Sequence, residues 1–115
     1  MMKKSVWLSY DLGIQGDYDH LYAWLDNHNA VECGNSIAYL EIDVTVGLDD
    51  ADFIKWIKSD MEKTIVFKPG NRLYIIRRIT DEKRDSFFGQ FIIGKRKASP
   101  WEGFGEKPEA VEDGA

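Results

Sequence analysis

The sequence predicts an α+β fold of the ferredoxin-like type, a β-α-β-β-α-β sandwich with an additional C-terminal strand and a disordered acidic tail. Three observations lead to this prediction. Residues 5–11 alternate apolar and polar side chains with the period of two that a strand requires. Two segments, 18–28 and 50–62, repeat apolar residues at the spacing of a helix that buries one face. Further alternating runs separate and follow these helices, as in a split βαβ unit.

Local signals place the individual elements. Asp17 is positioned to cap the first helix, and Gly34-Asn35 predicts a two-residue hairpin turn between two strands. Gly89 predicts a bulge in the last strand, since glycine inside a strand pattern often marks one. The predicted strands, in order, span 5–11, 30–33, 36–46, 64–67 (a short β-like run), 72–79 and 87–93.

The composition is that of one globular domain. The chain has 115 residues, of which 43% are hydrophobic and 30% charged. Its net charge is −5, but residues 101–115 hold five acids and one lysine, so the remainder is nearly neutral. We therefore divide the chain into a domain at 1–98 and a flexible acidic tail at 99–115. This balance gives no sign of a strongly basic nucleic-acid-binding protein.

The expected compartment is the cytoplasm. Cys33 is the one cysteine in the sequence, so no internal disulfide can form, which fits a reducing environment. Polar residues soon follow the opening Met-Met-Lys-Lys and interrupt the apolar run that a signal peptide needs. No apolar run approaches the roughly 18 residues of a transmembrane helix, so no membrane partner is expected.

Asp11 is the candidate catalytic residue and metal ligand, because it ends the first and central strand just before a loop that contains two glycines. A carboxylate in this place can hold Mg²⁺, a hard cation that prefers oxygen ligands. Alternatively, Asp11 hydrogen-bonds loop amides ahead of the helix. One carboxylate per chain becomes a metal site only if a dimer axis brings a second one near it.

Two sets of residues are candidates for nucleic-acid binding. Trp7 and Tyr39 are expected to be neighbours on the sheet face away from the helices, where aromatic rings can stack bases. Alternatively, a second subunit or residues 86–94 cover that face. The second set is basic and could contact phosphates, or form a solvated rim that blunts strand edges. Its members are Arg77, Arg78, Lys83, Arg84, Lys95, Arg96 and Lys97.

Three short segments resemble one known family. Ser9-Tyr10-Asp11 resembles the Tyr-Asp signature that ends the first strand of the small CRISPR-associated endoribonuclease-like proteins. Residues 31–39 resemble the strand after their first helix, and residues 71–75 resemble their last core strand. The virulence-associated VapD-type ribonucleases share that fold. The resemblance spans residues 4–79.

The resemblance implies a ferredoxin-like homodimer. It also implies that Asp11 from each chain lies near the dimer interface, where the pair could hold a divalent metal such as Mg²⁺ for phosphodiester hydrolysis. This chain departs from the family pattern in the loop after Asp11, which lacks basic residues, and in the helix at 18–28, which contains no Lys or Arg.

Three functions follow as hypotheses. The first is a metal-dependent nuclease, or a nuclease-derived nucleic-acid-associated protein, with Asp11 as the ligand. The second is a non-catalytic RNA-binding domain that uses its basic rim or its open sheet face. The third is a dimeric protein–protein interaction module, which requires Trp7 and Tyr39 to be buried in the dimer and Asp11 to be satisfied by loop amides.

Overall fold

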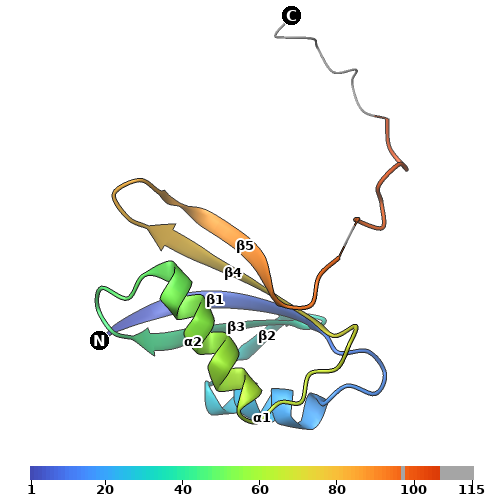
Figure 1. Ribbon diagram of the computed structural model, residues 1–115, viewed down its shortest axis with the longest axis horizontal. Coiled ribbons are helices and arrows are strands. Elements are labelled where there is room, and N and C mark those ends of the chain that lie inside the picture. The colour runs from blue at the N-terminus through green and yellow to red at the C-terminus, as the bar shows by residue number, and fades with distance from the viewer. Residues whose placement is uncertain (97, 107–115) are drawn as a thin grey trace, which may run out of the picture.

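The computed structural model describes residues 1–96 and 98–106, and within them it confirms an α+β architecture (Figure 1). Residues 107–115 of the predicted acidic tail lie outside the described residues, and Lys97 does as well. In chain order the elements are β1 (Met2–Asp11), α1 (Tyr18–Asn27), β2 (Val31–Gly34), β3 (Ile37–Val44), α2 (Asp50–Glu62), β4 (Arg72–Thr80) and β5 (Asp85–Ile93).

The five strands form one sheet in the order β2-β3-β1-β4-β5, and every neighbouring pair is antiparallel. β1 is the central strand, as its alternation predicts. It pairs with β3 through Trp7 opposite Tyr39, and with β4 through Trp7 opposite Ile76. β5 extends the sheet beyond β4. It therefore does not cover the sheet face, which was one of the alternatives for residues 86–94.

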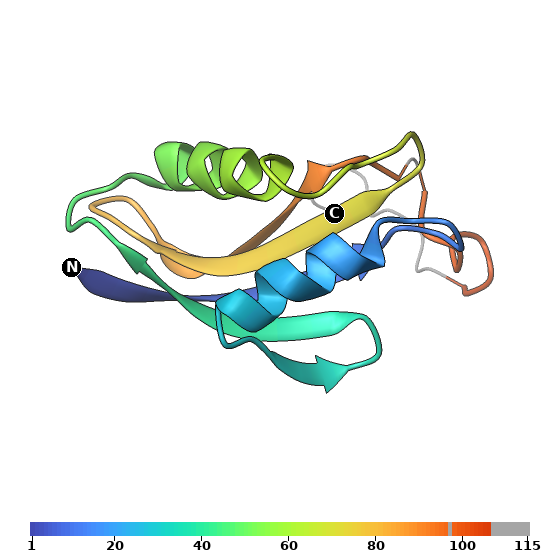
Figure 2. The same cartoon turned by 90° about the horizontal axis from the view of Figure 1, so that it is seen from below.

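Both helices begin at an aspartate that caps exposed backbone amides. The Asp17 side chain accepts a hydrogen bond from the His20 amide, and the Asp49 side chain accepts one from the Asp52 amide. Figure 2 shows α1 along the side of the sheet that holds β1 and β3, and α2 along β4. Neither helix in the described part of the chain is long and apolar enough to cross a membrane.

The core lies between these helices and one face of the sheet. Alternate residues of each strand point toward the helices, because side chains along a strand alternate between its two faces. The strand residues in the core include Val6, Leu8, Tyr10, Ala38, Leu40, Ile42, Val44, Leu73 and Ile75. The helices contribute Leu21, Trp24, Leu25, Phe53, Ile57 and Met61.

Three local predictions were wrong. Residues 64–67, all described, form no strand, although Ile65 is buried in the core. The hairpin between β2 and β3 turns at Asn35-Ser36 and not at Gly34-Asn35; Ser36 takes the positive φ of 60°, and Gly34 pairs with Ile37. The bulge in β5 falls at Ile92, because Leu73 pairs with Ile93 and Tyr74 with Phe91.

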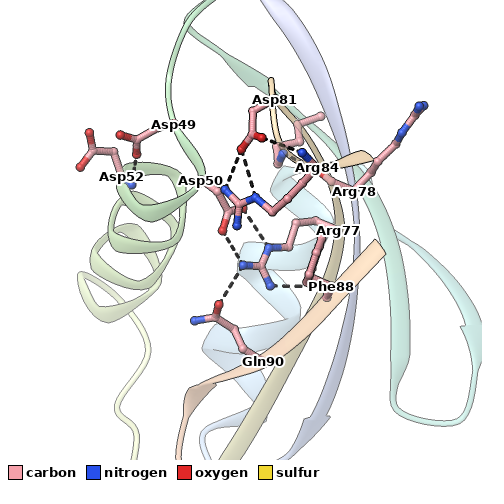
Figure 3. A network of polar contacts seen from close by, with 10 residues as sticks. Asp49, Asp50, Asp52, Arg77, Arg78, Asp81, Arg84, Phe88 and Gln90 are labelled. Carbon is pink, nitrogen blue, oxygen red and sulfur yellow. Dashed lines mark hydrogen bonds and ion pairs between the residues drawn. The ribbon is translucent and has the colours of Figure 1, made fainter. Parts of the chain in front are cut away.

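A buried ion pair fastens α2 to the sheet (Figure 3). Arg77, on the helix side of β4, donates from Nε and Nη2 to the two carboxylate oxygens of Asp50, at 2.9 and 2.5 Å. Its remaining donors reach the Gln90 side chain at 2.8 Å and the Phe88 carbonyl at 3.4 Å, both on β5. The Arg77 side chain is only 3% exposed. The hydrogen bonds from Arg77 hold the pKa of Asp50 below its ordinary value, although burial acts in the opposite direction.

Candidate functional site

The sheet surface opposite the helices, which we call the open face, carries a row of apolar residues across all five strands. Val31 pairs with Tyr39, Tyr39 with Trp7, Trp7 with Ile76, and Ile76 with Gly89. The predicted adjacency of Trp7 and Tyr39 is therefore present, with ring centroids 5.1 Å apart at an angle of 52°. Cross-strand neighbours of this kind are the contacts that stabilise a sheet and shape its surface.

A second row, apolar except for Ser9 at its centre, runs beside the first. Ile37 pairs with Ser9, Ser9 with Tyr74, and Tyr74 with Phe91. The rings of Tyr74 and Phe91 meet edge to face with centroids 4.9 Å apart. Gly89 leaves the space for the Tyr74 ring, since a Cβ on Gly89 would overlap it.

Much of this apolar surface is accessible. Phe87 is 62% exposed, Ile76 40% and Ile37 38%, whereas Trp7 and Tyr39 are half-buried by one another and by Phe87. Five strands spaced about 4.8 Å apart, with β1 and β3 paired over about 26 Å, give an open face of roughly 600 Å². Apolar side chains occupy the centre of this face, and an exposed apolar patch on a small protein often marks an interaction site.

The rim of the open face is charged but balanced. At one end Lys3 pairs with Asp43, at 3.1 Å, and Arg78 pairs with Asp85, at 2.7 Å. At the other end Arg72 pairs with Asp11 at 2.8 Å. An apolar centre inside a polar rim is the usual anatomy of a protein–protein interface. Nucleic-acid binding instead depends on an excess of cations, because it is driven by neutralising phosphates.

Both carboxylate oxygens of Asp11, the predicted catalytic and metal-binding residue, are engaged within the chain. Oδ2 accepts from Arg72 Nη2 at 2.8 Å, and Oδ1 accepts from the Gly13 amide at 3.0 Å. These bonds, that from Arg72 above all, lower the pKa of Asp11. Within residues 1–96 and 98–106, no three His, Cys, Asp or Glu side chains gather closely enough to hold a metal ion. The contacts of Asp11 match the loop-capping interpretation.

The predicted basic set is spread over the molecule. Arg77 points into the core, while Arg78, the next residue, points to the open face. Arg96 lies beside Arg72, and Arg72 is about 20 Å from Arg78 along β4. Lys95 is exposed next to Arg96, and Lys97 lies outside the described residues. The described members therefore do not form one continuous phosphate-binding edge.

The sequence predicts that part of the strand at 72–79 lies on the open face with Trp7 and Tyr39, but it did not identify which residues of β4 do so, nor that β5 contributes. Tyr74, Ile76, Phe87 and Phe91 join Trp7 and Tyr39 there. The alternation of residues 72–79 could have placed Tyr74 and Ile76 opposite the core, but the register of β5 depends on the bulge at Ile92.

Comparisons with known proteins returned no family model, no curated protein and no solved structure that matches this chain. The assignment of function therefore depends on the chemistry of the open face alone.

Proposed function

We propose that this protein is a non-catalytic interaction module that forms a homodimer through the open face of a ferredoxin-like sheet. The observation that carries the proposal is the apolar row from Val31 to Gly89, which crosses all five strands and is left uncovered by the described chain. Burying such a surface is favourable at about 25 cal/mol per Å² before the costs of association are subtracted.

The ferredoxin-like part of the proposal is supported by the strand order. The first four strands follow β2-β3-β1-β4, in which each helix connects two strands that lie on either side of a third. That arrangement is what a split βαβ connection requires. β5 is then an addition at the edge beside β4.

The charge balance favours a second protein copy over a nucleic acid. Each ion pair on the rim joins one cation to one anion, so the rim gives little net attraction for phosphates. In a symmetric dimer the same patch meets itself, and a surface with equal numbers of both signs is compatible with that. Apolar rows of aliphatic and aromatic residues also suit protein contact more than base stacking.

Single-stranded nucleic acid is the second candidate. The pairing of Trp7 with Tyr39 on neighbouring central strands favours it, since bases stack on aromatic rings in such positions. A Mg²⁺-dependent nuclease, the family-like activity, would need Asp11 to exchange its bond with Arg72 for a metal and to meet a second Asp11 across the dimer.

The test is sedimentation equilibrium of the wild type and of Ile76→Lys, which places a charge in the middle of the open face. The matched control is Trp56→Lys, because Trp56 has the same 40% exposure but lies on α2, on the helix side of the sheet. We expect the wild type and Trp56→Lys to sediment as dimers, at twice 13.2 kDa, and Ile76→Lys as a monomer of unchanged circular dichroism.

A wild type that stays monomeric, or an Ile76→Lys variant that still dimerises, would contradict the proposal. The same samples are then titrated with single-stranded RNA and DNA by fluorescence anisotropy, with and without Mg²⁺. Binding that is lost in Trp7→Ala would show that the open face binds single-stranded nucleic acid. Metal-dependent cleavage that is lost in Asp11→Ala would support the nuclease hypothesis instead.

A further inference from the structure

Two large aromatic side chains after β5 are mostly exposed to solvent. After β5, residues 99–104 form two successive turns, in which the Glu102 amide donates to the Ser99 carbonyl and the Phe104 amide to the Trp101 carbonyl, each at 3.0 Å. Trp101 is 73% exposed and Phe104 86% exposed. Tryptophan and phenylalanine are the side chains that contribute most to binding when they are buried in a partner's pocket.

The open face has a pocket of matching chemistry. A cleft of about 280 Å³ lies at its end, lined by Ser9, by the aromatic residues Tyr10, Tyr74 and Phe91, by Arg96, and by the ion pair of Arg72 with Asp11. Aromatic walls suit an indole ring, and arginine can both stack on an aromatic ring and bind a carboxylate. Trp101 is followed directly by Glu102, so one short segment offers both of the groups that the cleft can recognise.

We propose that Trp101 and Glu102 of one copy occupy this cleft in the second copy, with the indole against Tyr74 and Phe91 and the carboxylate facing Arg96. The proposal rests on the homodimer proposed above and names the segment that completes its interface. Because the dimer is symmetric, the contact is made twice, once on each copy.

The area needed by a stable dimer supports this occupant. An open face of roughly 600 Å² is smaller than the roughly 800 Å² that each partner buries in an interface of standard size. A buried tryptophan or phenylalanine adds about 150–250 Å². Burial of Trp101 therefore brings the buried area of each copy to roughly 750–850 Å², which is in the standard range.

Sedimentation equilibrium of full-length variants tests the proposal. We expect Trp101→Ala to weaken dimerisation about tenfold or more, as truncation of a buried aromatic anchor does. Trp56→Ala is the control, because Trp56 is an accessible tryptophan on α2, away from the open face. Glu102→Lys should weaken the dimer as well, and Arg96→Glu combined with Glu102→Lys should recover part of the loss. A merely structural role of the tail would not produce that recovery.

The outcomes separate this inference from the homodimer itself. If Trp101→Ala dimerises like the wild type while Ile76→Lys is monomeric, the open-face dimer stands and the tail contact is wrong. If Ile76→Lys also dimerises, both proposals fail. A monomeric wild type whose Trp101 is protected from iodide quenching, and becomes accessible in Arg72→Ala, would place the segment in the cleft of its own chain and overturn the second copy as its host.

Discussion

Removing the carboxylate of Asp50 should destabilise the protein far more than removing that of Asp85. Both aspartates pair with arginines at successive positions of β4, Arg77 and Arg78. The side chains of the Arg77 pair are 3% and 15% exposed, whereas those of the Arg78 pair are each 59% exposed. The two variants Asp50→Ala and Asp85→Ala therefore compare one chemical change in a buried and in an exposed setting.

The expected loss of stability in Asp50→Ala depends on the hydrogen bonds that Arg77 keeps. Breaking a buried ion pair from one side costs about 3–5 kcal/mol, because the remaining charge stays in the core without its partner. Gln90 and the Phe88 carbonyl still accept hydrogen bonds from Arg77, so we expect the lower end, about 3 kcal/mol for Asp50→Ala. Asp85→Ala should change stability little, since exposed pairs contribute little. Replacing both Arg77 and Asp50 by apolar residues should cost less than Asp50→Ala alone.

Urea unfolding followed by circular dichroism measures this difference. With a slope of about 1.5 kcal/mol per M, a loss of about 3 kcal/mol lowers the midpoint by about 2 M. All variants must be compared at one protein concentration, because dimerisation adds to apparent stability. Equal midpoints for Asp50→Ala and Asp85→Ala would refute the reasoning that burial of the Arg77 pair fixes α2 on the sheet.

Three further results are expected. Because the pKa of Asp50 is lowered in the folded protein, the unfolded chain binds the proton first as the pH falls. The stabilisation from Asp50 is therefore complete above about pH 4 and is lost as the pH falls through the folded-state pKa. The free energy of unfolding, measured from pH 6 to 2.5, should depend less on pH in Asp50→Asn than in the wild type. Gly89→Ala should cost about 1–3 kcal/mol through overlap with the Tyr74 ring, and the cost should be much smaller in Tyr74→Ala; similar costs in both backgrounds would rule out the overlap. Asn71→Ala should cost about 2 kcal/mol in a thermal melt, because the buried Asn71 side chain bonds the Lys68 amide and the Leu12 carbonyl; an unchanged midpoint would contradict this.

The sequence was sufficient to predict the elements whose signals are local. Alternation located β1, β3 and β4, and the helical spacing of apolar residues located both helices, because these patterns involve residues within one element. The prediction of a strand at residues 64–67 was wrong because an apolar, β-branched run also fits an extended loop that buries Ile65 without a strand partner. The predicted turn position between β2 and β3 was wrong because Ser36 takes the positive φ, a conformation that local preferences assign to Gly or Asn before Ser.

The candidate site was harder to predict because it depends on residues far apart in sequence. Arg77 and Arg78 were grouped as one basic rim, yet neighbouring strand residues face opposite sides, and only the distant Asp50 reveals why an arginine is tolerated in the core. The contact of Asp11 with Arg72 likewise joins the ends of β1 and β4 and leaves no trace in local spacing.

The two edges of the sheet differ in how they resist unwanted growth. β2 is only four residues long and has an irregular register, whereas β5 has nine residues and pairs on one side only within the described chain. From Ser86 to Ile93 the edge contains no charged residue and no proline, the usual obstacles to strand addition. Asp85 and Lys95 are the charged residues that flank this aggregation-prone stretch on either side. On heating or partial unfolding, we expect β5 to be the edge of the sheet to which strands of other copies add.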